Sequence, residues 1–142
     1  MPTKQSSAVW KGGLRTGQGT YVLGPGGATV PYGFPTRFET DDGTSPEELL
    51  AAAHAACYSM ALAAGLEKGG HPATEVRTTA ECTIEKVGEG FKVTRMRLTT
   101  RAKVPGLSKE QFAQVSEGAR DGCPISGALK GNLEIVLDAR LE

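Results

Sequence analysis

The pattern of apolar and polar residues predicts short strands at the start of the chain, followed by one long apolar helix. Short extended runs lie at 8–10, 19–23 and 34–39, and turns rich in glycine and proline separate them. The segment 47–65, EELLAAAHAACYSMALAAG, consists mainly of strong helix formers. Beyond its first turn this helix is apolar on almost every side, so we expect it to be buried under a sheet or against a partner subunit.

The start of this helix carries the clearest local signals in the sequence. Ser45 occupies the N-cap position before Pro46, a residue that is favoured at the first helical position. Glu48 lies three residues after Ser45, where a capping box needs it. Acidic side chains in the first turn also complement the helix dipole.

The second half of the chain mixes strand and helix patterns. Alternation over 76–87 and 91–102, around a glycine-rich turn, predicts an antiparallel strand pair. Ser108 caps a second helix, a short third helix follows over 124–130, and 133–141 alternates as a final strand. This order predicts an α+β fold, with an antiparallel sheet and a long buried central helix, in a single domain of 142 residues.

Composition narrows the class of protein. Sixteen basic residues balance sixteen acidic ones, which argues against a nucleic-acid partner and against a polybasic membrane anchor. No stretch is expected to reach the roughly 20 apolar residues that span a bilayer. The first ten residues lack the apolar region of a signal peptide. We therefore expect a soluble, cytoplasmic protein.

The chain has three cysteines, Cys57, Cys82 and Cys123. An odd number without a C-x-x-C motif argues against a secreted disulfide scaffold and against structural zinc. Cys82 alternates with polar residues on a strand and is interpreted as a small core residue. Cys57, in the apolar helix, would by itself be an inert buried thiol, whereas Cys123 precedes a proline at a helix cap, where a thiolate is favoured.

Three other side chains are candidates for a role in the chemistry of Cys57. His54 lies one helical turn before it, which allows a Cys-His nucleophile, although a packed histidine is the better interpretation. Arg37 and Glu47 flank the helix in the sequence. An arginine near a thiol lowers its pKa, and a carboxylate can hold the arginine in place. Spacing alone favours ordinary surface charge for both.

Five motifs together resemble a known family. They are PYGFPTRFE at 31–39, GTSPEEL at 43–49, AHAACYSM at 53–60, VPG at 104–106 and GCPIS at 122–126. In this combination and order they are similar to the osmotically inducible protein C family, the OsmC branch of the OsmC/Ohr organic hydroperoxide peroxidases. The resemblance extends from about residue 9 to the end of the chain.

The resemblance implies roles for particular residues. Cys57 matches the peroxidatic cysteine of the family and Cys123 the resolving cysteine. Arg37 matches the arginine that activates the thiol, and Glu47 the carboxylate that holds it, with Glu48 as the neighbouring alternative. The family also implies an intertwined homodimer with active sites at its interface.

The implied reaction reduces an organic hydroperoxide to an alcohol through a Cys57 sulfenic acid and a Cys57–Cys123 disulfide, which a thiol or dithiol reductant reopens. No metal, flavin or haem cofactor is needed. On a straight helix, Glu47 and Cys57 lie about 15 Å apart along the axis. A shared pocket therefore requires a bent first turn or a carboxylate from the other subunit.

Two alternatives remain from other classes of protein. One is a stress-related ligand-binding protein whose cysteines only pack. The other is an acyl hydrolase that uses Cys57 and His54. Apolar neighbours of Cys57, such as Leu50 and Met60, further predict a preference for organic peroxides over hydrogen peroxide.

Overall fold

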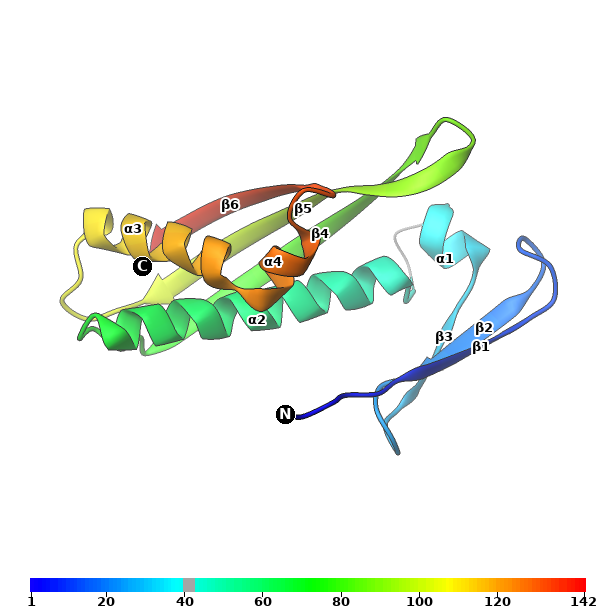
Figure 1. The fold of residues 1–142 in the computed structure, drawn as a ribbon, viewed down its shortest axis with the longest axis horizontal. Helices are drawn as coiled ribbons and strands as arrows, with labels where there is room; N and C mark the ends of the chain where they lie inside the picture. The colour runs from blue at the N-terminus through cyan, green and yellow to red at the C-terminus, as the bar shows by residue number, and fades with distance from the viewer. Residues whose placement is uncertain (40–42) are drawn as a thin grey trace. The chain divides into compact units, whose positions relative to one another are not determined.

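The computed structural model describes residues 1–39 and 43–142, which divide into two units, Met1–Leu49 and Leu50–Glu142. That a single domain spans the whole chain stays a prediction. The first unit contains a three-stranded antiparallel sheet in the order β1-β2-β3 (Figure 1). Its strands are β1 (Ser7–Lys11), β2 (Gln18–Val22) and β3 (Thr29–Tyr32). The predicted runs 8–10 and 19–23 are confirmed by β1 and β2.

The third predicted extended run was wrong, because it forms the short helix α1 (Phe34–Phe38). Gly33 precedes it in extended conformation, and Thr36 Oγ1 accepts a hydrogen bond from the Gly33 N–H at 3.0 Å. Pro35 sits in the first turn, where its missing N–H has no helical partner to lose. Arg37 therefore lies on a helix rather than on a strand.

The second unit packs helices against a longer sheet (Figure 1). Its elements are α2 (Pro46–Lys68), which starts at the end of the first unit, β4 (Glu75–Val87), β5 (Gly90–Lys103), α3 (Lys109–Gly122), α4 (Pro124–Leu129) and β6 (Glu134–Leu141). The predicted caps are present. Ser45 Oγ accepts from the Glu48 N–H at 3.2 Å, and Ser108 forms a capping box with Gln111.

The sheet of the second unit has the order β4-β5-β6 and is mixed. β4 and β5 form the predicted antiparallel hairpin, whose register runs from Glu75 opposite Lys103 to Val87 opposite Gly90. β6 pairs with β5 in parallel, so the prediction of an antiparallel sheet was wrong for this strand. Two helices, α3 and α4, lie between β5 and β6 in the chain. This crossover returns the chain to the end of the sheet at which β5 began, so β6 runs in the same direction as β5.

One face of α2 forms the centre of the core. Tyr58, Leu62 and Leu66 are buried at helical spacing and belong to one apolar cluster with Met96 and Leu98 of β5. Successive inward residues of β5 are two apart, as the pleat of a strand requires. The predicted central helix is therefore confirmed in position.

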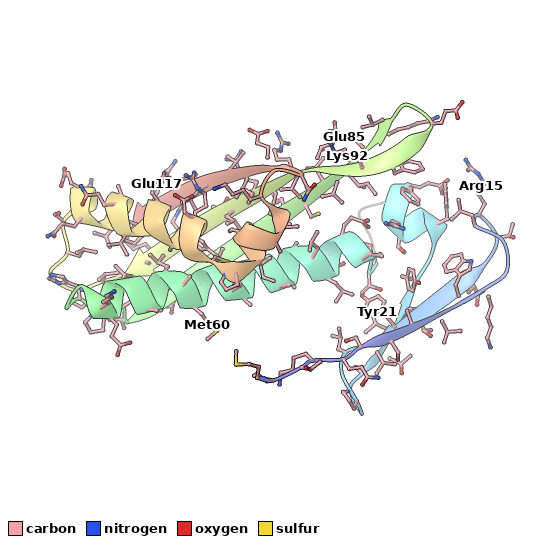
Figure 2. The ribbon with its side chains drawn as sticks, viewed as in Figure 1. Arg15, Tyr21, Met60, Glu85, Lys92 and Glu117 are labelled. Atoms are coloured by element: carbon pink, nitrogen blue, oxygen red, sulfur yellow. The ribbon has the colours of Figure 1, made fainter. Side chains whose placement is uncertain are left out.

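The opposite face of α2 is open in the single chain. Met60 is 75% exposed and projects from the side of α2 away from β4–β6 (Figure 2). The prediction of burial on all sides thus holds for only one face of the helix within this chain. The expectation that no segment could span a bilayer was also too strong, because α2 is long and apolar enough by length and composition. Its packed face is that of a core helix.

Candidate active site

Two cysteines meet where α2 passes the junction of α3 and α4. The Sγ atoms of Cys57 and Cys123 are 3.0 Å apart, within hydrogen-bond distance, and both residues are free thiols. Cys123 ends α3 with its N–H bonded to the Ala119 carbonyl at 2.9 Å, and it is also the cap residue of α4, which starts at Pro124. A covalent disulfide needs an S–S distance of about 2.05 Å, so a small approach joins the two sulfurs.

The surroundings of the two sulfurs differ. Burial raises the pKa of the Cys57 thiol, and the contact with Cys123 raises it further against a smaller effect of the Ile125 backbone N–H. Burial also acts to raise the pKa of Cys123, but polar contacts with the Cys57 thiol and with the N–H and hydroxyl of Ser126 outweigh it and lower that pKa. The backbone N–H and hydroxyl of Ser126 thus distinguish the surroundings of Cys123 from those of Cys57.

His54 does not form the Cys-His pair that the sequence allowed. Its ring is fully buried, and its Nε2 atom lies 2.7 Å from the hydroxyl oxygen of Ser126. The hydrogen-bond partner of Nε2 is therefore Ser126 and not Cys57. Nδ1 has no hydrogen-bond partner among the described residues. Burial lowers the pKa of His54, so the ring is neutral at neutral pH. The sequence analysis did not single out Ser126, although its place three residues after Cys123 puts both on one side of a helix.

The charged pair lies in the first unit. Arg37 Nε on α1 donates a hydrogen bond to Glu47 Oε1, in the first turn of α2, at 2.9 Å. Glu47 is 7% exposed, whereas the neighbouring Glu48 is exposed. Between these two carboxylates, the structure thus pairs Glu47 with Arg37. A buried carboxylate that holds one side of a guanidinium fixes its orientation.

An aromatic cavity of about 190 Å³ adjoins Arg37 within the first unit. Its lining consists mainly of apolar side chains and includes Trp10, Tyr32, Phe34 and Phe38. A guanidinium at the wall of an apolar cavity can bind a molecule that has a polar oxygen at one end and a hydrocarbon at the other.

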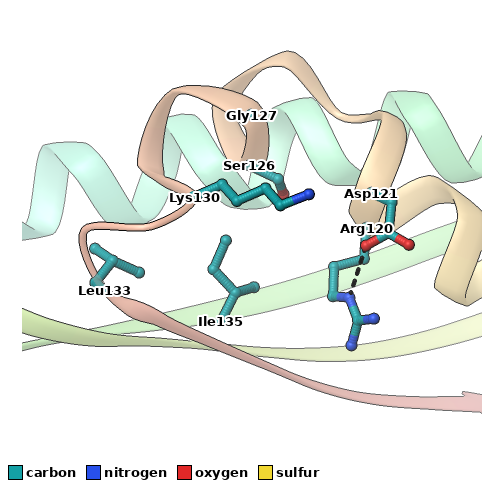
Figure 3. A pocket seen from close by; sticks show the side chains of 7 residues that line it. All are labelled: Arg120, Asp121, Ser126, Gly127, Lys130, Leu133 and Ile135. Carbon is teal, nitrogen blue, oxygen red and sulfur yellow. Dashed lines mark hydrogen bonds and ion pairs between the residues drawn. The ribbon is translucent and has the colours of Figure 1, made fainter.

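A second cavity, of about 180 Å³, borders α4 (Figure 3). Ser126 contributes to its wall, together with the apolar side chains of Leu133 and Ile135 and the cations Arg120 and Lys130. In Figure 3, Arg120 is engaged by the carboxylate of Asp121 at 3.3 Å. The cavity therefore leaves space on one side of Ser126.

The third cysteine stands apart from this chemistry. Cys82 on β4 pairs in register with Met96 and packs against the apolar core of the second unit. Within residues 1–39 and 43–142, no group of three His, Cys, Asp or Glu side chains is placed to hold a metal ion.

Comparisons with known proteins point to one family. Residues 39–138 match the model of a family described as OsmC-like protein. The chain is 43% identical to the peroxiredoxin OsmC of Escherichia coli over 140 residues, which cover 98% of this chain and 96% of that protein. It is 34% identical to an organic hydroperoxide resistance protein of Xanthomonas axonopodis over 98 residues, which cover 68% and 66% of the two chains.

Solved structures give the same result for the fold. An organic hydroperoxide resistance protein from Elizabethkingia anophelis aligns with a TM-score of 0.75 at 26% identity, over 99% of each chain. A protein from Legionella pneumophila, described as an organic hydroperoxide resistance protein OsmC, aligns with a TM-score of 0.72 at 25% identity, over 98% of each chain. The mixed α+β fold with two small sheets is therefore the fold of these proteins.

Proposed function

This chain belongs to the OsmC-like protein family, and from that membership we propose that it is a thiol-dependent peroxidase that reduces organic hydroperoxides to alcohols. The observation that carries the proposal is the 3.0 Å approach of Cys57 and Cys123 in a chain that is 43% identical to a peroxiredoxin. Two thiols at this distance can form a disulfide with little motion of the backbone.

The proposed cycle has three steps. The Cys57 thiolate attacks the distal peroxide oxygen, the O–O bond breaks, and the alkoxide takes a proton to leave as an alcohol. Cys57 is then a sulfenic acid, which condenses with the Cys123 thiol to a disulfide and releases water. A thiol or dithiol reductant reopens the disulfide by exchange. The two electrons that reduce the peroxide thus come from that reductant.

The first step needs a cation near Cys57. Burial raises the pKa of this thiol, which disfavours the thiolate that attacks the peroxide. We propose that Arg37, held by Glu47, lowers the pKa of Cys57 in the assembled enzyme and binds the peroxide oxygens. The aromatic cavity beside Arg37 supports an organic substrate, because it offers apolar walls to a hydrocarbon tail.

The functional assembly is proposed to be an intertwined homodimer. The open face of α2 carries Met60, which is 75% exposed, together with several exposed alanines. An apolar stripe of this kind on a folded chain favours contact with another protein surface, and a second copy supplies an identical stripe. Sedimentation that gives an active monomer would contradict this part of the proposal.

The proposed location is the cytoplasm. The cycle starts from reduced thiols and needs a thiol reductant for every turnover, and both conditions are met in a reducing compartment.

Steady-state assays test the proposed function directly. The reduced protein is supplied with cumene hydroperoxide and a dithiol, and loss of peroxide is followed. We expect turnover that saturates with the organic peroxide and a lower kcat/KM for hydrogen peroxide. Equal rates on the two substrates would contradict the proposal that the apolar cavity selects organic peroxides. No turnover on either substrate would contradict the peroxidase function and favour the ligand-binding alternative.

A further inference from the structure

A second pair of side chains lies one helical turn from each of the two thiols. His54 is three residues before Cys57 on α2, and Ser126 is three residues after Cys123 on α4. The contact between His54 Nε2 and Ser126 Oγ, at 2.7 Å, therefore joins the same two segments as the contact between the sulfurs, at 3.0 Å. The two contacts are neighbours, because residues three apart share a helix face.

We propose that the Ser126 hydroxyl donates a hydrogen bond to Cys123 Sγ while the disulfide forms, and that His54 holds Ser126 in the orientation for this donation. Ser126 then acts on a reacting atom, whereas His54 is a positioning residue that works through Ser126. This inference deepens the proposed peroxidase function and rests on it.

The direction of the hydrogen bonds follows from burial. His54 is fully buried and Ser126 is 4% exposed, so their polar atoms need partners within the protein. A neutral imidazole has one N–H and one lone pair. Since Nδ1 has no partner in the part of the chain that the structure describes, it is better placed to carry the lone pair than the N–H. The proton therefore resides on Nε2, and His54 donates to Ser126 Oγ.

With its oxygen accepting from His54, Ser126 keeps its own O–H for another acceptor. The groups of Ser126, its backbone N–H and its hydroxyl, are among those that lower the pKa of Cys123 against the opposing effect of burial. We expect the contact between the Ser126 hydroxyl and Cys123 Sγ to shorten when negative charge develops on the sulfur.

The step that this arrangement serves is the condensation of sulfenic acid and thiol. Cys123 loses its proton, and an electron pair of its sulfur forms the S–S bond to Cys57. The S–O bond of the Cys57 sulfenic acid breaks, and the oxygen leaves as hydroxide, which takes up one proton to become water. Cys123 sulfur is oxidised and Cys57 sulfur is reduced, so no external oxidant is needed. A donor beside Cys123 favours the thiolate that starts the step.

The test compares paired variants at each position. Ser126→Ala removes the hydroxyl and Ser126→Thr keeps it. His54→Leu removes the donor, whereas His54→Gln keeps an N–H at a similar distance from the backbone. Each reduced protein receives one equivalent of cumene hydroperoxide. Peroxide loss, sulfenic acid trapped by dimedone and disulfide are then measured in rapidly quenched samples by mass spectrometry.

We expect Ser126→Ala and His54→Leu to slow disulfide formation by about tenfold, as loss of a hydrogen bond to a charged group predicts. Peroxide loss should stay within about twofold of the parent protein, so that trapped sulfenic acid accumulates. Ser126→Thr and His54→Gln should restore the rate. Thermal melting checks that each variant is folded. If Ser126→Ala or His54→Leu unfolds, the rates of Ser126→Thr and His54→Gln still test the proposal.

Three results would overturn the inference. Disulfide formation at the parent rate in both Ser126→Ala and His54→Leu would show that the hydroxyl is not used. Slow formation in Ser126→Thr and His54→Gln as well would assign the effect to packing rather than to donation. Absence of peroxide loss in the parent protein would refute the proposed function and this inference with it, whereas the first two results leave the peroxidase intact.

Discussion

Two pairs of side chains, one in each unit, divide the proposed chemistry between them. Arg37 and Glu47 form an ion pair beside an aromatic cavity, so the first unit supplies charge and an apolar wall. Cys57 and Cys123 form a thiol pair 3.0 Å apart, so the second unit supplies the sulfur. Burial raises the pKa of Cys57, which disfavours its thiolate. Sulfur proximity thus explains how a disulfide can form, and we propose that attack by Cys57 depends on the charge of the other pair.

Among the variants proposed, replacing the two thiols one at a time should change peroxide turnover most. Cys57→Ser should abolish peroxide turnover, by about a thousandfold or more, because a serine hydroxyl is not ionised at neutral pH. Cys123→Ser should still consume one equivalent of peroxide and then stop at a Cys57 sulfenic acid. Peroxide loss and intact mass report both outcomes. Cys82→Ser is the matched control and should behave like the parent, and full activity of Cys57→Ser would reject the assignment.

Breaking the ion pair should have the next largest effect. Arg37→Met removes the cation and should slow the oxidation of Cys57 about a hundredfold, while disulfide formation from a preformed sulfenic acid continues. Glu47→Gln should slow the oxidation of Cys57 about tenfold, because it leaves the Arg37 guanidinium without its carboxylate. Single-turnover peroxide loss is the measurement. The exposed Glu48 offers a control, and if Glu48→Gln were as slow as Glu47→Gln the role of the carboxylate would be misassigned.

A charge on the open face of α2 tests whether this face forms the interface of the proposed dimer. Met60→Asp should weaken self-association at least about tenfold, since a carboxylate in an apolar interface loses its hydration. Sedimentation velocity over a range of concentrations gives the change. Val87, the last residue of β4, is similarly apolar and 54% exposed, so Val87→Asp serves as the control. Equal association of parent and Met60→Asp would place the interface elsewhere.

The smallest expected effect concerns pH and the buried histidine. Burial lowers the pKa of His54 in the folded chain below its ordinary 6.5. Below about pH 6.5 the unfolded chain therefore binds a proton that the folded chain does not, so stability is fully present above that pH and falls as the pH drops. Urea unfolding between pH 8 and pH 5 measures this slope. His54→Gln should remove most of it, and a slope that stays unchanged in this variant would contradict the assignment to His54.

The elements that the sequence predicted best are those with strong local signals. The helix from Pro46 has a cap, a proline and a continuous run of helix formers, and each of these acts within a few residues. The hairpin of β4 and β5 follows from strict alternation around a glycine turn. Both were predicted to within three residues at each end.

The failures arise where structure depends on distant contacts or on very short segments. The helix α1 is five residues long, too short for a period to appear, and its only signal is Pro35 in the first turn. The parallel direction of β6 is set by the crossover of α3 and α4, which an alternating pattern does not encode.

The candidate site shows the same division. The approach of Cys57 and Cys123 joins residues 66 apart, and it could be expected only from the resemblance to a family. The contact of His54 with Ser126 joins residues 72 apart, and no motif or period connects them. Between Glu47 and Glu48 the sequence left a choice. The structure buries Glu47 and pairs it with Arg37, and the role of this carboxylate in the reaction stays a prediction.

The central claim is that Cys57 and Cys123 form one redox pair, and a peroxide titration tests it most directly. The reduced protein receives one equivalent of cumene hydroperoxide, the remaining thiols are counted, and the disulfide is mapped by mass spectrometry. We expect the loss of two thiols per chain, a Cys57–Cys123 disulfide and an unmodified Cys82. If the thiols persist, or if Cys82 is the residue that reacts, Cys57 and Cys123 are not the redox pair.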